Sequence, residues 1–135
     1  MAQVTGRRGL VSNDTPATLS NAYTITKLDD VPDRATLIPG AAWLAHIDVV
    51  FDTIAGGATQ ATWYLCRDAA GDEPITDELS TTIVLGATDA TDGGVSARID
   101  RPYRPIQSDL GSIYVAMKVN NGGTANGTFE LYWVE

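Results

Sequence analysis

Apolar and polar residues alternate along most of this chain, with the two-residue period of a strand that has one buried face. The clearest run is 113–119, which is apolar at every odd position and small, amphipathic or charged between. A second run, 128–133, repeats the pattern. The residues between them, 121–127, are mostly Asn, Gly, Thr and Ala, and Asn and Gly tolerate positive φ angles. The pattern therefore predicts that these two runs form a β-hairpin.

The longest alternating run is 42–53, which predicts a strand with one continuous apolar face. That face consists of Trp43, Ala45, Ile47, Val49 and Phe51. The glycine pair in 55–58 predicts a turn into a further strand over 59–67. This second predicted hairpin would bring Trp43 and Trp63 close together.

Three shorter runs, 22–28, 81–85 and 95–100, also alternate, and two prolines at positions 102 and 105 end the last of them. Seven predicted strands without a convincing amphipathic helix indicate an all-β protein. We expect an antiparallel two-sheet β-sandwich, and one sequence does not decide between jelly-roll and immunoglobulin-like topology.

Residues 1–20 have no sustained hydrophobic period. They predict an extended N-terminal arm, followed by a sandwich domain over 21–135. Two interpretations of the arm stay open. It is either a frayed terminus or a segment that orders on a neighbouring subunit, where Arg7 and Arg8 would meet carboxylates.

Length and charge narrow the possible functions. A chain of 135 residues suits one domain that buries a core without disulfides. The net charge is −8, and all of the excess lies beyond residue 40, where 13 acidic residues face 5 basic ones. Because an acidic surface repels phosphates, we do not expect nucleic acid as a partner.

The sequence offers little catalytic or metal-binding chemistry. Cys66 and His46 are the single residues of their types, so neither a disulfide nor a zinc site with the usual nitrogen and sulfur ligands is predicted. Cys66 should be a small buried or half-buried side chain, and His46 should share an outer face with Asp48. The acidic turns at 68–73 and 89–92 contain oxygen ligands for calcium, but their spacing fits turn formation better. We therefore predict no enzyme activity, no catalytic residues and no cofactor.

No apolar run approaches the roughly 18 residues of a membrane helix. The first residues also lead into no hydrophobic signal core. We accordingly expect a protein that is made and used without export and has no membrane partner.

Tyr64, Tyr114 and Tyr132 fall on the outward faces of their predicted strands. Outward tyrosines stack on sugar rings in carbohydrate-binding modules, and they also anchor subunit interfaces. We favour the interface, to which Arg7 and Arg8 would contribute from the arm.

The runs 111–122 and 127–133, together with the Thr-, Ala- and Gly-rich composition, make the chain similar to the accessory structural proteins of tailed-bacteriophage virions. The resemblance implies a capsid decoration or cement protein that binds the outer capsid lattice, often as a trimer. The implied partner is the major capsid protein or another virion protein. The implied location is the virion, after synthesis in the host cytoplasm. A tail, neck or fibre component and a carbohydrate-binding module are the alternatives.

Overall fold

The computed structural model describes residues 8–13, 15–29, 43–86, 88, 90–103 and 113–134. This part of the chain contains strands and turns and no helix, which confirms the predicted all-β class. The strands are β1 (Arg8–Ser12), β2 (Ala17–Leu19), β3 (Thr24–Leu28), β4 (Trp43–Ala55), β5 (Gln60–Cys66), β6 (Leu79–Thr82), β7 (Val84–Leu85), β8 (Gly93–Tyr103), β9 (Ile113–Val119) and β10 (Thr124–Val134).

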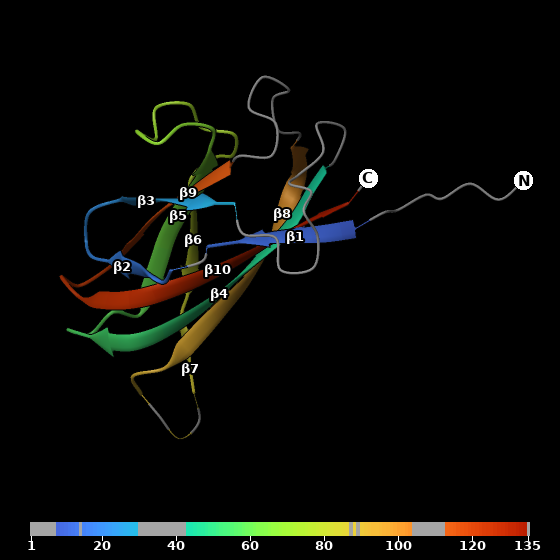
Figure 1. The fold of residues 1–135 in the computed structure, drawn as a ribbon. Helices are drawn as coiled ribbons and strands as arrows, with labels where there is room; N and C mark the ends of the chain where they lie inside the picture. The colour runs from blue at the N-terminus through green and yellow to red at the C-terminus, as the bar shows by residue number, and fades with distance from the viewer. Residues whose placement is uncertain are drawn as a thin grey trace, which may run out of the picture.

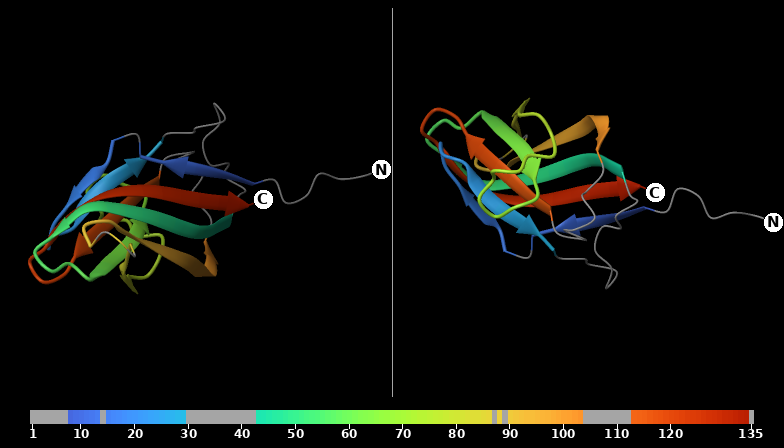
Figure 2. Two further views of the ribbon diagram at one scale, coloured as in Figure 1. Left: turned by 90° about the horizontal axis from the view of Figure 1, so that it is seen from below. Right: turned by 90° about the horizontal axis from the view of Figure 1, so that it is seen from above.

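The strands form two antiparallel sheets that pack face to face (Figure 1). One sheet has the order β1-β10-β4-β8-β7, with β2 also paired to β10, and the other has the order β3-β9-β5-β6. Most connections therefore cross from one sheet to the other. This strand order is that of a jelly roll, so the structure decides the topology that the sequence left open. The layer that contains β10 and β4 is seen from two sides in Figure 2.

Both predicted hairpins are wrong. β9 and β10 follow each other in the chain but belong to different sheets, and so do β4 and β5. The alternation shows that each strand has one buried face, and this holds whether consecutive strands pair or face each other across the core. Trp43 and Trp63 consequently lie in different sheets, where Trp63 is fully buried and Trp43 is partly exposed.

The first three residues of β4 do not follow the predicted inner face. The alternation holds from Ile47 to Phe51, but Leu44 is buried in place of its predicted inward neighbours Trp43 and Ala45. The cause is a register shift between Leu44 and His46 that leaves Ala45 without a partner on either side. Such a β-bulge reverses the faces of all residues before it.

The core fills the space between the sheets with apolar side chains from both. The largest fully buried side chains include Trp63, Phe51, Phe129 and Met117. Cys66 lies on the outer face of β5, opposite Tyr114, and is nevertheless buried; burial raises the pKa of its thiol to about 11. A thiol with so high a pKa is almost entirely protonated near neutral pH and is therefore a poor nucleophile.

The predicted arm is wrong for the described part of residues 1–20. β1 and β2 both pair with β10, and Val11 and Leu19 are fully buried. The sequence missed these strands because runs of five and three residues are too short to show a period. Residues 1–7, including Arg7, lie outside the described residues. The sandwich therefore begins no later than Arg8.

The loops that connect β4 to β5 and β9 to β10 meet at one end of the sandwich. The side-chain oxygen of Asn120 accepts hydrogen bonds from the backbone N–H groups of Thr59 (2.8 Å) and Gln60 (3.0 Å). A Cβ added to Gly123 would lie 2.8 Å from the Cβ of Ala58. The added Cβ would also lie 2.9 Å from the backbone nitrogen of Ala58, so the two loops are in close contact at this end of the sandwich.

We expect Gly123→Ala to lower the free energy of unfolding by about 2 kcal/mol, because one loop must move. The new methyl group would also approach the carbonyl oxygen of Ala55 to 2.7 Å. Gly57→Ala is the matched control: its φ is +78°, nothing lies within 4 Å of the added Cβ, and the left-handed conformation alone costs about 1 kcal/mol. Urea denaturation measures both, and a smaller loss for Gly123→Ala than for the control would contradict the close contact.

Candidate functional site

The predicted interface tyrosines lie on outer faces, as expected, but on two opposite ones. Tyr132 projects from the six-stranded sheet, between the buried residues of β10. Tyr64 and Tyr114 project from the four-stranded sheet. Arg8 pairs through its backbone with Val134 at the sheet edge. The predicted residues therefore do not form one continuous site.

On the six-stranded sheet, Tyr132 stacks on His46, its cross-strand neighbour. The ring centroids are 4.5 Å apart and the planes differ by 7°. Nε2 of His46 lies 3.5 Å from Oδ2 of Asp48, which confirms that these two residues share a face. The Tyr132 hydroxyl donates to Oε2 of Glu130 at 2.9 Å, and this bond, together with partial burial, raises the pKa of Tyr132. The stacked rings are therefore held in place, with the carboxylates of Asp48 and Glu130 beside them.

Two exposed valines extend the same outer face. Val50 on β4 and Val84 on β7 are 61% and 71% exposed, and both lie directly opposite Gly94 on β8. Because Gly94 has no side chain, the strip between the two valines is shallow and apolar. The face therefore combines an apolar strip with the Tyr132–His46 pair, a composition typical of protein interfaces.

On the four-stranded sheet, the segment after β5 folds back over the outer face. The Tyr64 hydroxyl donates to the carbonyl oxygen of Gly71 at 2.9 Å. Gly71 has a φ of +76°, and an added Cβ would lie 2.8 Å from that hydroxyl and 2.9 Å from Ile25. The Asp68 carboxylate accepts hydrogen bonds from the backbone N–H groups of Asp72 (3.1 Å) and Glu73 (3.0 Å), which fixes the turn.

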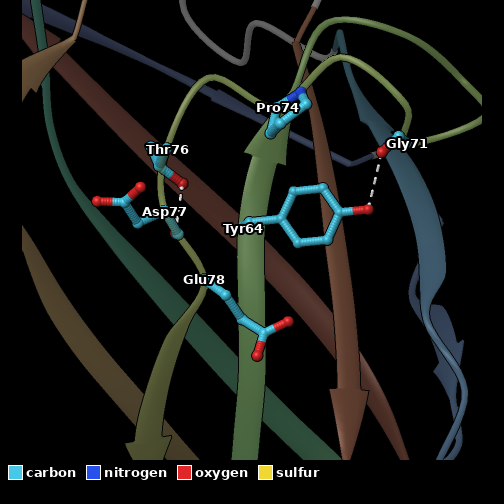
Figure 3. A pocket seen from close by; sticks show the side chains of 6 residues that line it. All are labelled: Tyr64, Gly71, Pro74, Thr76, Asp77 and Glu78. Atoms are coloured by element: carbon cyan, nitrogen blue, oxygen red, sulfur yellow. Dashed lines mark hydrogen bonds between the residues drawn. The ribbon is translucent and has the colours of Figure 1, made fainter.

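This segment and β5 enclose an open pocket of about 330 Å³ (Figure 3). Its lining residues are Tyr64, Gly71, Pro74, Thr76, Asp77 and Glu78. In Figure 3, Pro74 and Glu78 lie at opposite ends of the pocket, with the Tyr64 ring between them and Asp77 to one side. The buried Thr76 hydroxyl accepts from the backbone N–H of Leu65 at 3.0 Å, which anchors the lining segment to β5.

Tyr23, which the sequence did not single out, holds the Tyr64 ring in place. The two rings meet edge to face, with centroids 5.1 Å apart. The Tyr23 hydroxyl donates to Oε2 of Glu78, and Nζ of Lys118 lies 4.6 Å from the centre of the Tyr23 ring. Burial, the hydrogen bond and the charge of Glu78 raise the pKa of Tyr23, and burial and nearby acidic groups raise that of Tyr64. Both tyrosines therefore stay neutral phenols at neutral pH.

Tyr114 lies in the adjacent row of this face, opposite Lys27 on one side and Cys66 on the other. Among the described residues, no group of three or more His, Cys, Asp or Glu side chains is arranged to hold a metal ion. The described part of the chain also contains no helix long and apolar enough to cross a membrane.

No protein-family model and no curated protein matches this chain. Among solved structures, the coat protein of Tobacco streak virus is 8% identical, with 100% of this chain and 90% of that chain covered and a TM-score of 0.43. A structure of infectious bursal disease virus, Gt strain, is 14% identical over 97% of this chain and 34% of that chain, with a TM-score of 0.40.

The enzymatically active domain of tailspike protein 4 from bacteriophage CBA120 is also similar in structure. It is 14% identical over 86% of this chain and 19% of that chain, with a TM-score of 0.39. Similarities of this size leave the function to be argued from the surfaces of the chain itself.

Proposed function

We propose that this chain is a non-enzymatic structural protein of a virion, and specifically a capsid decoration or cement protein that binds the major capsid protein. The observation that carries the proposal is the presence of fixed, partly buried tyrosines on both outer faces of a jelly roll. Jelly rolls recur in viral capsids, and aromatic side chains framed by polar groups are the usual anchors of protein interfaces.

A protein with a binding surface on the outer face of each sheet could link two neighbouring proteins. Tyr132 would contact one neighbour, while Tyr64 and Tyr114 would contact a second. Many copies on a symmetric lattice convert such modest contacts into strong net attachment. We propose a trimer as the oligomer, with Arg7 and Arg8 meeting carboxylates of an adjacent subunit near the edge strand β1.

A carbohydrate-binding module is the second candidate, and the Tyr64 pocket favours it because an aromatic ring and carboxylates can hold a sugar. Heating scans with added oligosaccharides separate the two functions. A sugar-binding module would gain thermal stability from a ligand, whereas a capsid clamp would not. A tail, neck or fibre component would use the same protein contacts at another place in the virion.

The direct test is binding of the purified chain to particles of its own virus that lack it. We expect the wild-type chain to sediment with the particles and to raise their temperature of rupture. Tyr132→Ala should weaken binding about thirtyfold, as expected for an aromatic anchor at an interface. Thr128→Ala, four residues away on the same face of β10, is the control and should bind normally. Absence of particle binding by the wild-type chain would refute the proposal.

A further inference from the structure

The pocket beside Tyr64 joins an aromatic ring to two carboxylates, those of Asp77 and Glu78. None of the described residues that line it is basic. We propose that this pocket receives the basic side chain, arginine or lysine, of a neighbouring virion protein. This inference rests on the proposed function and names the chemistry of the partner at one of its two faces.

The Tyr64 ring is held rigidly before any partner arrives. Its hydroxyl is bound to the Gly71 carbonyl at 2.9 Å, and Tyr23 packs against it at 5.1 Å between centroids. A cation that stacks on a fixed ring gains the attraction of the ring face without having to order that ring first. A planar guanidinium group suits this geometry especially well because it can stack and hydrogen-bond together.

Charge determines the type of ligand that fits the pocket. Glu78 is already oriented by the hydrogen bond from Tyr23, and a carboxylate has acceptor sites for further donors. Asp68, Asp72 and Glu73 lie on the neighbouring segment, where they outnumber the basic residue Arg67 and make this side of the molecule more negative. A basic side chain would neutralise the pocket carboxylates, with charge-assisted hydrogen bonds. A neutral sugar would cover them without neutralising them.

The same cluster already contains one contact of the proposed kind. Nζ of Lys118 lies 4.6 Å from the centre of the Tyr23 ring. Lys118 is not among the described residues that line the pocket. A cation from another molecule would make the same kind of contact with the Tyr64 ring. Burial is the largest cause of the raised pKa values of Tyr23 and Tyr64, and the negative charge of Glu78 adds to both.

The experiment is an NMR titration of the isotope-labelled full chain with acetyl-arginine amide. We expect shifts at the amides of Gly71, Thr76 and Glu78. Acetyl-citrulline amide, which has nearly the same shape without the charge, should bind at least about tenfold more weakly. Choline and maltotriose, as a free ammonium ion and a neutral sugar, should both bind more weakly than the arginine derivative.

Glu78→Gln tests the carboxylate and should weaken binding of acetyl-arginine amide about tenfold. Glu130→Gln is the matched control, because Glu130 likewise accepts a tyrosine hydroxyl, but on the opposite sheet. It should leave the titration unchanged. Equal binding of the citrulline derivative, tighter binding of choline or maltotriose, or an equal loss in the two variants would overturn the proposal.

Particle binding separates this inference from the proposed function. If wild type and Glu78→Gln bind particles equally well, the basic side chain does not occupy this pocket, while the virion role stands. If the wild-type chain does not bind particles at all, the virion role itself fails, whatever the titration shows. A loss of particle binding in Glu78→Gln, with normal binding by Thr128→Ala, supports both proposals.

Discussion

Trp63→Ala is expected to lower the free energy of unfolding by about 3 to 5 kcal/mol, a large part of the stability of a domain of this size. Trp63 is fully buried between the sheets, and its indole N–H donates to Oγ1 of Thr81 at 3.2 Å. The substitution opens a cavity and removes the partner of that hydroxyl group. Thermal and urea denaturation, followed by circular dichroism, measure the loss.

Trp43→Ala is the matched control for this prediction. It removes the same number of atoms from a partly exposed position at the start of β4. We expect the free energy of unfolding to fall by about 1 kcal/mol, because this substitution removes less buried apolar surface. An equal loss in the two variants would contradict the distinction that the β-bulge creates between these tryptophans.

Asn13→Ala should lower the free energy of unfolding by about 3 kcal/mol, which is the second largest effect that we expect. Oδ1 of Asn13 accepts a hydrogen bond from the backbone N–H of Phe129 at 2.8 Å. Its Nδ2 donates to the carbonyl oxygens of Thr15 (2.9 Å) and Gly127 (3.1 Å). Because Asn13 and its bonds to Phe129 and Gly127 are buried, alanine leaves these two backbone groups without their partner.

Thr18→Ala is the control for Asn13→Ala, because Thr18 lies close by on β2 and is exposed. Thr18→Ala should lower the free energy of unfolding by no more than about 0.5 kcal/mol. Urea denaturation of both variants gives the comparison. If Asn13→Ala were as stable as Thr18→Ala, the N-terminal strands would contribute little to the sandwich, contrary to their pairing with β10.

Local periodicity was sufficient to predict most strands. β9 alternates over its whole length, so its residues and its buried face follow from the sequence. The sheet to which each strand belongs does not follow from the sequence. The loops that contain Gly56 and Gly123 were expected to be hairpin turns within one sheet, but they connect one sheet to the other. The reversal at Ala45 also depends on the register of two partner strands and leaves no local signal.

For the candidate site, sequence reasoning placed Tyr64, Tyr114 and Tyr132 outward, and the structure agrees. It did not separate them onto two faces, since that depends on the sheet to which each strand belongs. Tyr23 and Glu78 were missed because their contact joins the start of β3 to the segment before β6. Only the folded segment after β5 brings these elements together.

The position of β10 has a consequence for how this protein is made. β10 pairs with β1, β2 and β4, so it is synthesised after all three of the strands that it joins. The six-stranded sheet cannot form until β10 has been made, and before then the earlier strands lack their partner and have unpaired edges. Folding dominated by such distant pairings takes milliseconds to seconds. Newly made chains are therefore most prone to aggregate before β10 has joined the sheet.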